Sequence, residues 1–207
     1  MGAVIVNVWD IDKTLADTAH VWDNNVLQNK NDNCRTPEFA EALYAAKPFP
    51  WVRENKDLFQ SIQPSPFIDG PRWIPPRFNI IVTGRLQEHR ELTRTWFGIH
   101  TMGDVHGYVS VPWDDRCTTR EESHKRYVAA KVNKITDITE SLIRVMWAIN
   151  GTLFLSIYED DEKVLAGLAH LFSRQPASTS RCFYVQGWVV RDGAAPVTWY
   201  PDEVDDE

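Results

Sequence analysis

Two aspartates and a threonine follow an apolar segment near the start of the chain. Residues 3–9 (AVIVNVW) are almost all apolar, and Asp10, Asp12 and Thr14 come next at alternate positions. Aspartate is disfavoured in strands and is rarely buried without a partner, so its repetition here needs an explanation. Either the residues belong to an acidic turn, or they are held at the end of a strand for chemistry, which the D-x-D-x-T spacing favours.

Two later apolar segments end in polar residues of a related kind. These residues are Thr83, Gly84 and Arg85 after one segment, and Glu159, Asp160 and Asp161 after the other. A segment with a helical pattern between them carries Lys125 and Lys131. Since ligands of parallel α/β sheets bind beyond the carboxyl ends of the strands, we expect these groups to meet at one edge of a sheet.

Together these residue types are suited to phosphoryl transfer. Clustered carboxylates repel one another and need a hard divalent cation, and their oxygen atoms suit Mg²⁺. A metal-bound carboxylate can attack phosphorus to form an aspartyl phosphate, while a second carboxylate protonates the leaving group and later activates water. A hydroxyl, backbone N–H groups and a lysine can stabilise the transferring oxygens. The residues therefore predict a Mg²⁺-dependent enzyme that acts on a phosphorylated substrate.

The polar segments occur in the order DIDKTL, IIVTGR, an isolated lysine and YEDD. In this order they resemble the four motifs of phosphatases of the haloacid dehalogenase (HAD) superfamily, over roughly residues 4–172. The resemblance implies a Rossmann-like three-layer α/β/α sandwich with a mostly parallel central sheet. It also implies a Mg²⁺-dependent phosphohydrolase that forms an aspartyl phosphate.

The resemblance implies roles for the residues of the first two motifs. Asp10 would be the nucleophile and a Mg²⁺ ligand. Asp12 would be the general acid and base, and would bind the metal through its backbone carbonyl. Thr83 would bind the transferring phosphoryl group. The further candidates for contact with substrate are Thr14, Gly84 and Arg85. Arg85 is explained equally well as a solvated arginine at the start of a helix.

Two assignments have an alternative in the neighbouring sequence. Lys125 is expected to neutralise the nucleophile and the phosphate, because TTREESHK resembles family members whose lysine lies in the first turns of a helix. Lys131 is the alternative, and we expect it to be more exposed to solvent. The resemblance also implies a metal-binding pair, which would be Glu159 with Asp160, or Asp160 with Asp161 if the register moves by one residue. Asp160 belongs to either pair, and Asp161 could instead begin the next helix.

The elements that must position these residues alternate along the chain. Strands are expected at 3–9, 78–85, 107–113, 152–161 and 181–190. Helices are expected at 36–46, 86–99, 119–135, 138–149 and 162–173. In the third of these helices Thr119 and Glu122 have the spacing of a capping box. Strands separated by helices predict a mostly parallel sheet with helices on both faces.

The length of 207 residues suits a single domain over residues 1–207. Residues 15–77 separate the first two motifs and predict a small loop-rich or helical cap insertion. Residues 86–124 hold elements that the core itself requires, so a second large cap is not expected. A lightly capped site accepts bulky substrates, and the resemblance extends to HAD domains associated with the repair of RNA or DNA ends. Phosphorylated nucleic-acid ends are therefore one candidate substrate.

The sequence is compatible with other functions as well. The enzyme could instead act on nucleotides or sugar phosphates, or the chain could be a catalytically silent HAD-fold binding module, although the presence of both Asp10 and Asp12 weighs against the last. The sequence has no Gly-rich loop of the P-loop type. A response-regulator receiver is disfavoured, because it would carry its phosphorylated aspartate on a later strand and the D-x-D-x-T spacing does not fit it.

Composition places the protein among ordinary globular chains. It is 43% hydrophobic and 25% charged, and its formal net charge of −7 argues against a general phosphate-binding surface for nucleic acid. The three cysteines have no metal-ligand spacing, so we expect reduced thiols in an intracellular, cytoplasmic protein. Neither a signal peptide nor an apolar run of roughly 20 residues is present, so no membrane partner is expected. The sequence indicates no oligomeric state.

Overall fold

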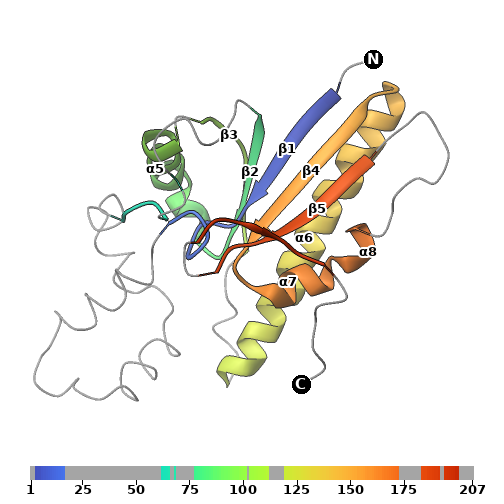
Figure 1. Cartoon of the computed structure of the whole chain (residues 1–207). Helices are drawn as coiled ribbons and strands as arrows, with labels where there is room; N and C mark the ends of the chain where they lie inside the picture. The colour runs from blue at the N-terminus through green and yellow to red at the C-terminus, as the bar shows by residue number, and fades with distance from the viewer. Residues whose placement is uncertain are drawn as a thin grey trace, which may run out of the picture.

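The computed structural model describes residues 3–16, 62–65, 68, 77–101, 103–111, 119–172, 183–191 and 194–200. These residues form an α/β architecture around one six-stranded sheet with the strand order β3-β2-β1-β4-β5-β6 (Figure 1). The strands are β1 (Ala3–Trp9), β2 (Phe78–Thr83), β3 (Val105–Ser110), β4 (Thr152–Glu159), β5 (Phe183–Val189) and β6 (Val197–Thr198). The first five run parallel, and β6 is antiparallel to β5. The predicted mostly parallel sheet is therefore confirmed.

The register of the central strands brings their carboxyl ends to one edge. Trp9, the last residue of β1, lies beside Ile81 of β2 and Tyr158 of β4. The residues that follow β1, β2 and β4 therefore leave the sheet at nearly the same level. This arrangement brings the loops after β1, β2 and β4 together at one edge of the sheet.

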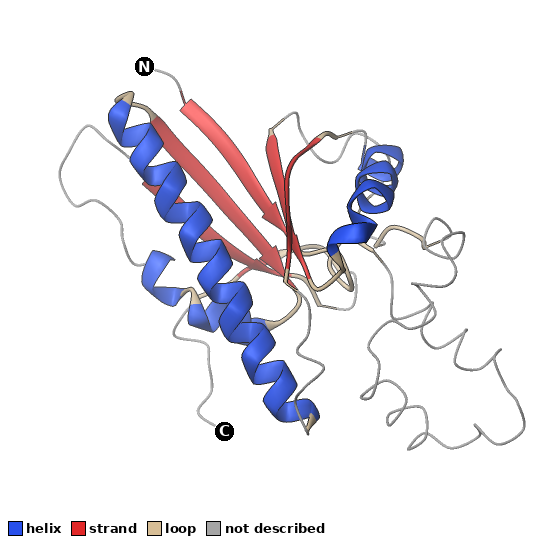
Figure 2. Cartoon of the chain, turned by 180° about the vertical axis from the view of Figure 1, so that it is seen from behind, coloured by secondary structure: helices blue, strands red, loops and turns tan. Residues whose placement is uncertain are grey.

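Helices cover both faces of the sheet. They are the short 3₁₀ helix η1 (Gln87–His89) and the α-helices α5 (Arg90–Thr101), α6 (Arg120–Ala148), α7 (Glu162–Gly167) and α8 (Ala169–Phe172). Trp96 and Phe97 of α5 share a core cluster with Trp9 and Ile81, on one face. On the other face, Ile135 of α6 belongs to a second core cluster, which also contains Val6 and Val8 of β1. Helix α6 runs along the length of the sheet on this face (Figure 2).

Helix α6 corrects one prediction. The sequence predicted two helices, at 119–135 and 138–149, whereas the structure has a single helix of 29 residues. No glycine or proline interrupts the segment, and the buried residues Ile135 and Thr139 lie four positions apart on one face across the expected break. At its start, the Thr119 side chain accepts a hydrogen bond from the backbone N–H of Glu122, as the capping pattern predicted.

The remaining elements differ from the predictions mainly at their ends. The predicted helix at 162–173 divides at Leu168 into α7 and α8, and the strand predicted at 107–113 begins and ends earlier, as β3. The two-residue strand β6 was not predicted, because it is too short to show an alternating pattern. The predicted helix at 36–46 and nearly all of the predicted cap insertion at 15–77 lie outside the described residues.

Within the described part of the chain, no helix has both the length and the apolar character needed to cross a bilayer.

Candidate functional site

The loop after β1 holds Asp10 in a buried position. Its backbone N–H donates to the carbonyl of Tyr158 at 3.0 Å, which continues the pairing of β1 with β4. The chain then turns back, because Leu15 N–H donates to the carbonyl of Ile11 at 2.9 Å and both of these side chains are buried. Lys13 takes a left-handed conformation in this turn, with φ of 65°. The tight turn brings the Thr14 hydroxyl to 3.3 Å from Asp10 Oδ2.

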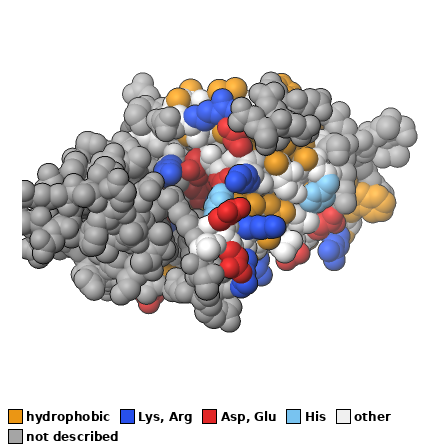
Figure 3. All heavy atoms as spheres, turned by 90° about the horizontal axis from the view of Figure 1, so that it is seen from below, with side chains coloured by type: hydrophobic (Ala, Val, Ile, Leu, Met, Phe, Trp, Pro, Cys, Tyr) orange, Lys and Arg blue, Asp and Glu red, His pale blue; other side chains and the backbone are white. Residues whose placement is uncertain are grey.

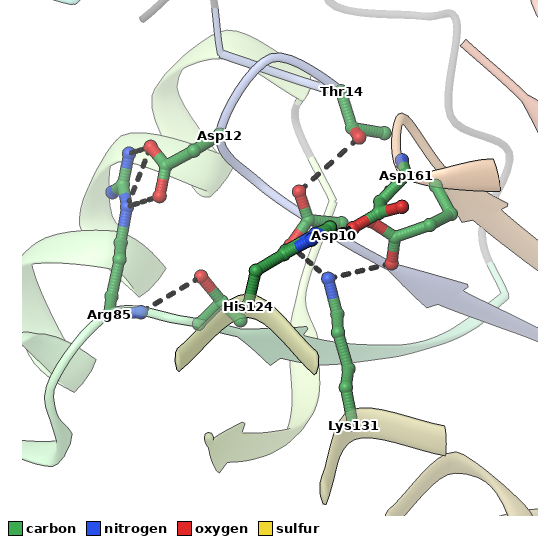
Figure 4. A network of polar contacts seen from close by, with 9 residues as sticks. Asp10, Asp12, Thr14, Arg85, His124, Lys131 and Asp161 are labelled. Carbon is green, nitrogen blue, oxygen red and sulfur yellow. Dashed lines mark hydrogen bonds and ion pairs between the residues drawn. The ribbon is translucent and has the colours of Figure 1, made fainter. Parts of the chain in front are cut away.

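Lys131 of α6 joins two carboxylates from different segments, one in the loop after β1 and one at the end of β4. Its Nζ lies 2.7 Å from Asp10 Oδ1 and 2.6 Å from Glu159 Oε2, and its side chain is only 1% exposed (Figure 4). The Tyr127 ring, one helical turn earlier, lies 5.4 Å from the same nitrogen. A buried ammonium with two carboxylate partners fixes both β1 and β4 against α6.

The prediction that Lys131 is exposed is wrong, and Lys125 is the exposed lysine. An α-helix turns by about 100° per residue, so residues six apart point in clearly different directions. Lys131 is four residues from both Tyr127 and Ile135, which face the sheet, whereas Lys125 falls outside this row. The spacing of four in this row was the sequence signal that could have selected Lys131.

Three carboxylates gather beside Lys131. Asp10, Glu159 and Asp160 each offer an oxygen within 4.8 Å of the others, and among the described residues this group has the ligand spacing of a metal site. Asp161 has a different role, because it caps α7 by accepting from Lys163 N–H at 3.0 Å. The structure therefore brings together the pair Glu159 and Asp160 of the two registers that the sequence left open.

Burial dominates the electrostatics of this cluster. It raises the pKa of Asp10 and of Glu159, although Lys131 opposes both shifts. Burial and the nearby charge of Asp10 raise the pKa of Asp160 to about 7. Burial by itself would lower the pKa of Lys131, but the charges of Asp10 and Glu159 together hold it well above its usual range. Three ionised carboxylates and one ammonium carry two excess negative charges, which matches one divalent cation.

Asp12 does not join the carboxylate cluster but pairs with Arg85. The guanidinium approaches both carboxylate oxygens, with Nη2 2.6 Å from Oδ1 and Nε 2.9 Å from Oδ2. The Arg85 side chain is 3% exposed and that of Asp12 is 18% exposed. Arg85 is therefore a buried residue of the site, and the alternative of a solvated arginine at a helix start is wrong.

The turn after β2 positions this pair. Thr83 is fully buried at the end of β2, and its hydroxyl accepts a hydrogen bond from the backbone N–H of Arg85 at 3.2 Å. Gly84 lies between them in the turn. Ser110, the last residue of β3, donates from its hydroxyl to the carbonyl of Arg85 at 2.6 Å. The predicted second motif therefore reaches the same edge of the sheet as the first and the fourth.

A histidine also reaches this edge. His124, on the first turns of α6, has its Nε2 2.6 Å from Asp161 Oδ2, and both side chains are partly exposed. This contact ties the start of α6 to the loop that carries Asp160. Figure 3 shows the molecule from below, where acidic, basic and histidine side chains intermingle over the described part of the face.

Comparison of the chain with protein-family models, with curated proteins and with solved structures finds no match. The chemistry of the site therefore rests on its residues and their geometry. These comprise a buried carboxylate cluster beside a lysine, an arginine–aspartate pair, and a buried threonine at the end of the neighbouring strand.

Proposed function

We propose that this protein is a Mg²⁺-dependent phosphohydrolase of the HAD type, with Asp10 as its nucleophile. The observation that carries the proposal is the Lys131 ammonium, which is buried between Asp10 and Glu159 while Asp160 lies close by. A nucleophilic carboxylate that must approach a phosphate dianion needs positive charge on both sides of the contact. Lys131 supplies one of these charges.

A divalent cation would supply the other. The donor set consists of carboxylate oxygens, which hard cations such as Mg²⁺ prefer. Asp10 and Asp160 would hold the ion directly, and the backbone carbonyl of Asp12 would complete the protein's contribution. Glu159, whose Oε2 is already bonded to Lys131, would add its charge and orient the lysine. When bound, Mg²⁺ would withdraw charge from the phosphoryl oxygens.

The residues can then divide the reaction into two steps. In the first, an Asp10 oxygen attacks phosphorus, the ester P–O bond breaks, and the leaving oxygen takes a proton from Asp12. In the second, water attacks phosphorus of the aspartyl phosphate while Asp12 removes its proton, which releases inorganic phosphate and restores the Asp10 carboxylate. Thr83, at the end of β2, would donate its hydroxyl to a phosphoryl oxygen.

The test is phosphate release from a generic aryl phosphate in the presence and absence of Mg²⁺. The native chain should release phosphate only with the cation, and Asp10→Asn should abolish release. Asp137→Asn serves as the matched control, because it makes the same change at an exposed position of α6. Activity that survives Asp10→Asn, or that is unaffected by removal of divalent cations, would contradict the proposal.

A substrate panel then distinguishes the kinds of phosphomonoester. Release from oligonucleotides with 3′- or 5′-phosphates, and not from small molecules, would support the processing of nucleic-acid ends. Release only from nucleotides or sugar phosphates would support a small-molecule phosphatase. Binding of these compounds without release from any of them would point to a silent binding module.

A further inference from the structure

We propose that Arg85 exchanges its anionic partner during the reaction. Without substrate it holds Asp12, and with substrate it holds the phosphoryl group, so that the arrival of the phosphate releases Asp12 for proton transfer. This inference rests on the proposed function, because it assigns a step to the same site. It adds that Asp12 becomes available as the acid only when a phosphate is bound.

Arg85 is the stationary member of the pair. Its side chain is 3% exposed, and its backbone is held on both sides by Thr83 and Ser110. Its Nη1 also lies 3.4 Å from the hydroxyl of Thr93 on α5. The backbone contacts fix the start of the side chain, and the buried guanidinium cannot swing out to solvent without losing its contact with Thr93. If the ion pair opens, the aspartate must therefore be the side chain that moves.

Asp12 is placed to be that mobile member. Its side chain is the more exposed of the two and belongs to the loop after β1, two residues beyond the nucleophile. Figure 4 shows its carboxylate directed toward Arg85 and away from Asp10. Both carboxylate oxygens accept from the guanidinium. A carboxylate that accepts at both oxygens has no proton to give, so Asp12 must leave Arg85 and take up a proton from water before it can act as the acid.

The phosphoryl group is the anion that can replace Asp12. A buried guanidinium left without an anion is strongly unfavourable, so release of Asp12 requires a substitute. The fork of an arginine fits two phosphate oxygens in the same way as two carboxylate oxygens. Thr83, the proposed phosphoryl ligand, accepts directly from the backbone of Arg85, so both groups belong to one turn. Phosphate and Asp12 therefore compete for one cation.

If phosphate and Asp12 compete for Arg85, Asp12→Asn should strengthen phosphate binding. The measurement is the affinity of the full chain for inorganic phosphate, determined by calorimetry in the presence of Mg²⁺. Asp12→Asn should tighten phosphate binding by about tenfold, because Arg85 loses its competing anion. Arg85→Gln should weaken binding. In the Arg85→Gln background, Asp12→Asn should change the affinity by less than about twofold, because the two residues act through one contact.

Asp161→Asn is the control for general electrostatics. It removes one negative charge from the same edge of the sheet but does not touch Arg85, so it should change the affinity by less than about twofold. If Asp161→Asn tightens phosphate binding as much as Asp12→Asn does, charge alone is responsible and the exchange is overturned. The same conclusion follows if Asp12→Asn tightens phosphate binding equally in the native chain and in the Arg85→Gln variant. An Asp12→Asn variant that binds phosphate no more tightly than the native chain would also overturn it.

A second measurement uses the native chain and requires no substitution. In the native chain, the Arg85 Nε–H signal in nitrogen-15 NMR should shift as inorganic phosphate is added, over the same concentrations that release heat. A signal unchanged at saturating phosphate would refute the exchange. If the native chain hydrolyses aryl phosphate but fails these tests, only the exchange is lost. If it neither hydrolyses aryl phosphate nor binds phosphate, both proposals are lost.

Discussion

The two cations of the site have opposite charge environments. Lys131 is buried at the edge of the sheet beside Asp10, Glu159 and Asp160, so that region has more acidic than basic groups. Arg85 faces one carboxylate, that of Asp12, and the pair is balanced. The first region is therefore suited to take up a further cation, and the second to exchange one anion for another. Both cations are buried, so water cannot solvate their charges and each depends on its anionic partners.

The largest effect should follow from removing the sealed cation. Lys131→Met leaves Asp10 and Glu159 buried without a counter-charge, so we expect the free energy of unfolding to fall by about 3–5 kcal/mol. Activity on aryl phosphate should fall by about 1,000-fold, because the positive charge beside Asp10, the proposed nucleophile, is lost. Chemical denaturation and steady-state kinetics would measure the two effects.

Lys125→Met is the matched control on the same helix. Because Lys125 is exposed, both quantities should stay close to those of the native chain, within about 0.5 kcal/mol for unfolding. If the two lysine variants behave alike, or if Lys125→Met is the more damaging, the assignment of Lys131 to the site is wrong.

Reducing the negative charge beside Lys131 should weaken the uptake of Mg²⁺. Asp160→Asn removes one proposed ligand and one charge, so we expect the affinity for Mg²⁺ to fall by about tenfold or more. The same substitution at Asp12 should have a much smaller effect on Mg²⁺, because only its backbone carbonyl is proposed to contact the ion. Calorimetric titration with Mg²⁺ would compare the two. Equal losses would remove the distinction between the two regions.

The carboxylate cluster also predicts how the effect of Mg²⁺ depends on pH. The pKa of Asp160 is raised from its ordinary value of 3.8 to about 7, so the neutral form is favoured in the folded protein without metal. The raised pKa of Asp160 therefore contributes to the stability of the folded protein below about pH 3.8, the ordinary pKa. This contribution is lost as the pH rises through about 7. Because Mg²⁺ requires the ionised form, stabilisation by the ion should grow up to this pH and then level off.

Thermal unfolding with and without Mg²⁺ between pH 5.5 and 8.5 would test this dependence. At a concentration one hundred times its dissociation constant, the ion should stabilise the native chain by about 2.7 kcal/mol at the upper end of this range. Asp160→Asn should remove most of the variation of this increment with pH. An increment that is already complete at pH 5.5 in the native chain would contradict the shifted pKa.

The smallest effect should come from the contact between His124 and Asp161. Both side chains are partly exposed, so His124→Gln should lower the free energy of unfolding by about 1 kcal/mol or less. Phosphate release should change little, because the pair does not touch the reacting atoms. A large loss of activity in kinetic assays would instead place this histidine in the chemistry.

Much of the fold could be predicted from local patterns. The segments that form β1, β2, β4 and β5 were recognisable in the sequence because each is a short run of mostly apolar residues. Helix α6 was wrongly predicted as two helices, although the sequence between them contains no glycine or proline to break it. Helix ends depend on packing against the sheet as well as on local composition, and that packing is not visible in the sequence.

The sequence by itself determined that Asp10 and Asp12 follow an apolar strand, and that Thr83 and Asp160 lie at the ends of two others. That information is local, because it depends on composition and on the spacing within each segment. Only the tertiary structure decided that Lys131 reaches Asp10, that Glu159 completes the carboxylate cluster, and that Asp12 pairs with Arg85. These choices depend on which strands are neighbours and on how α6 is rotated on the sheet. Both are set by contacts between residues far apart in the chain.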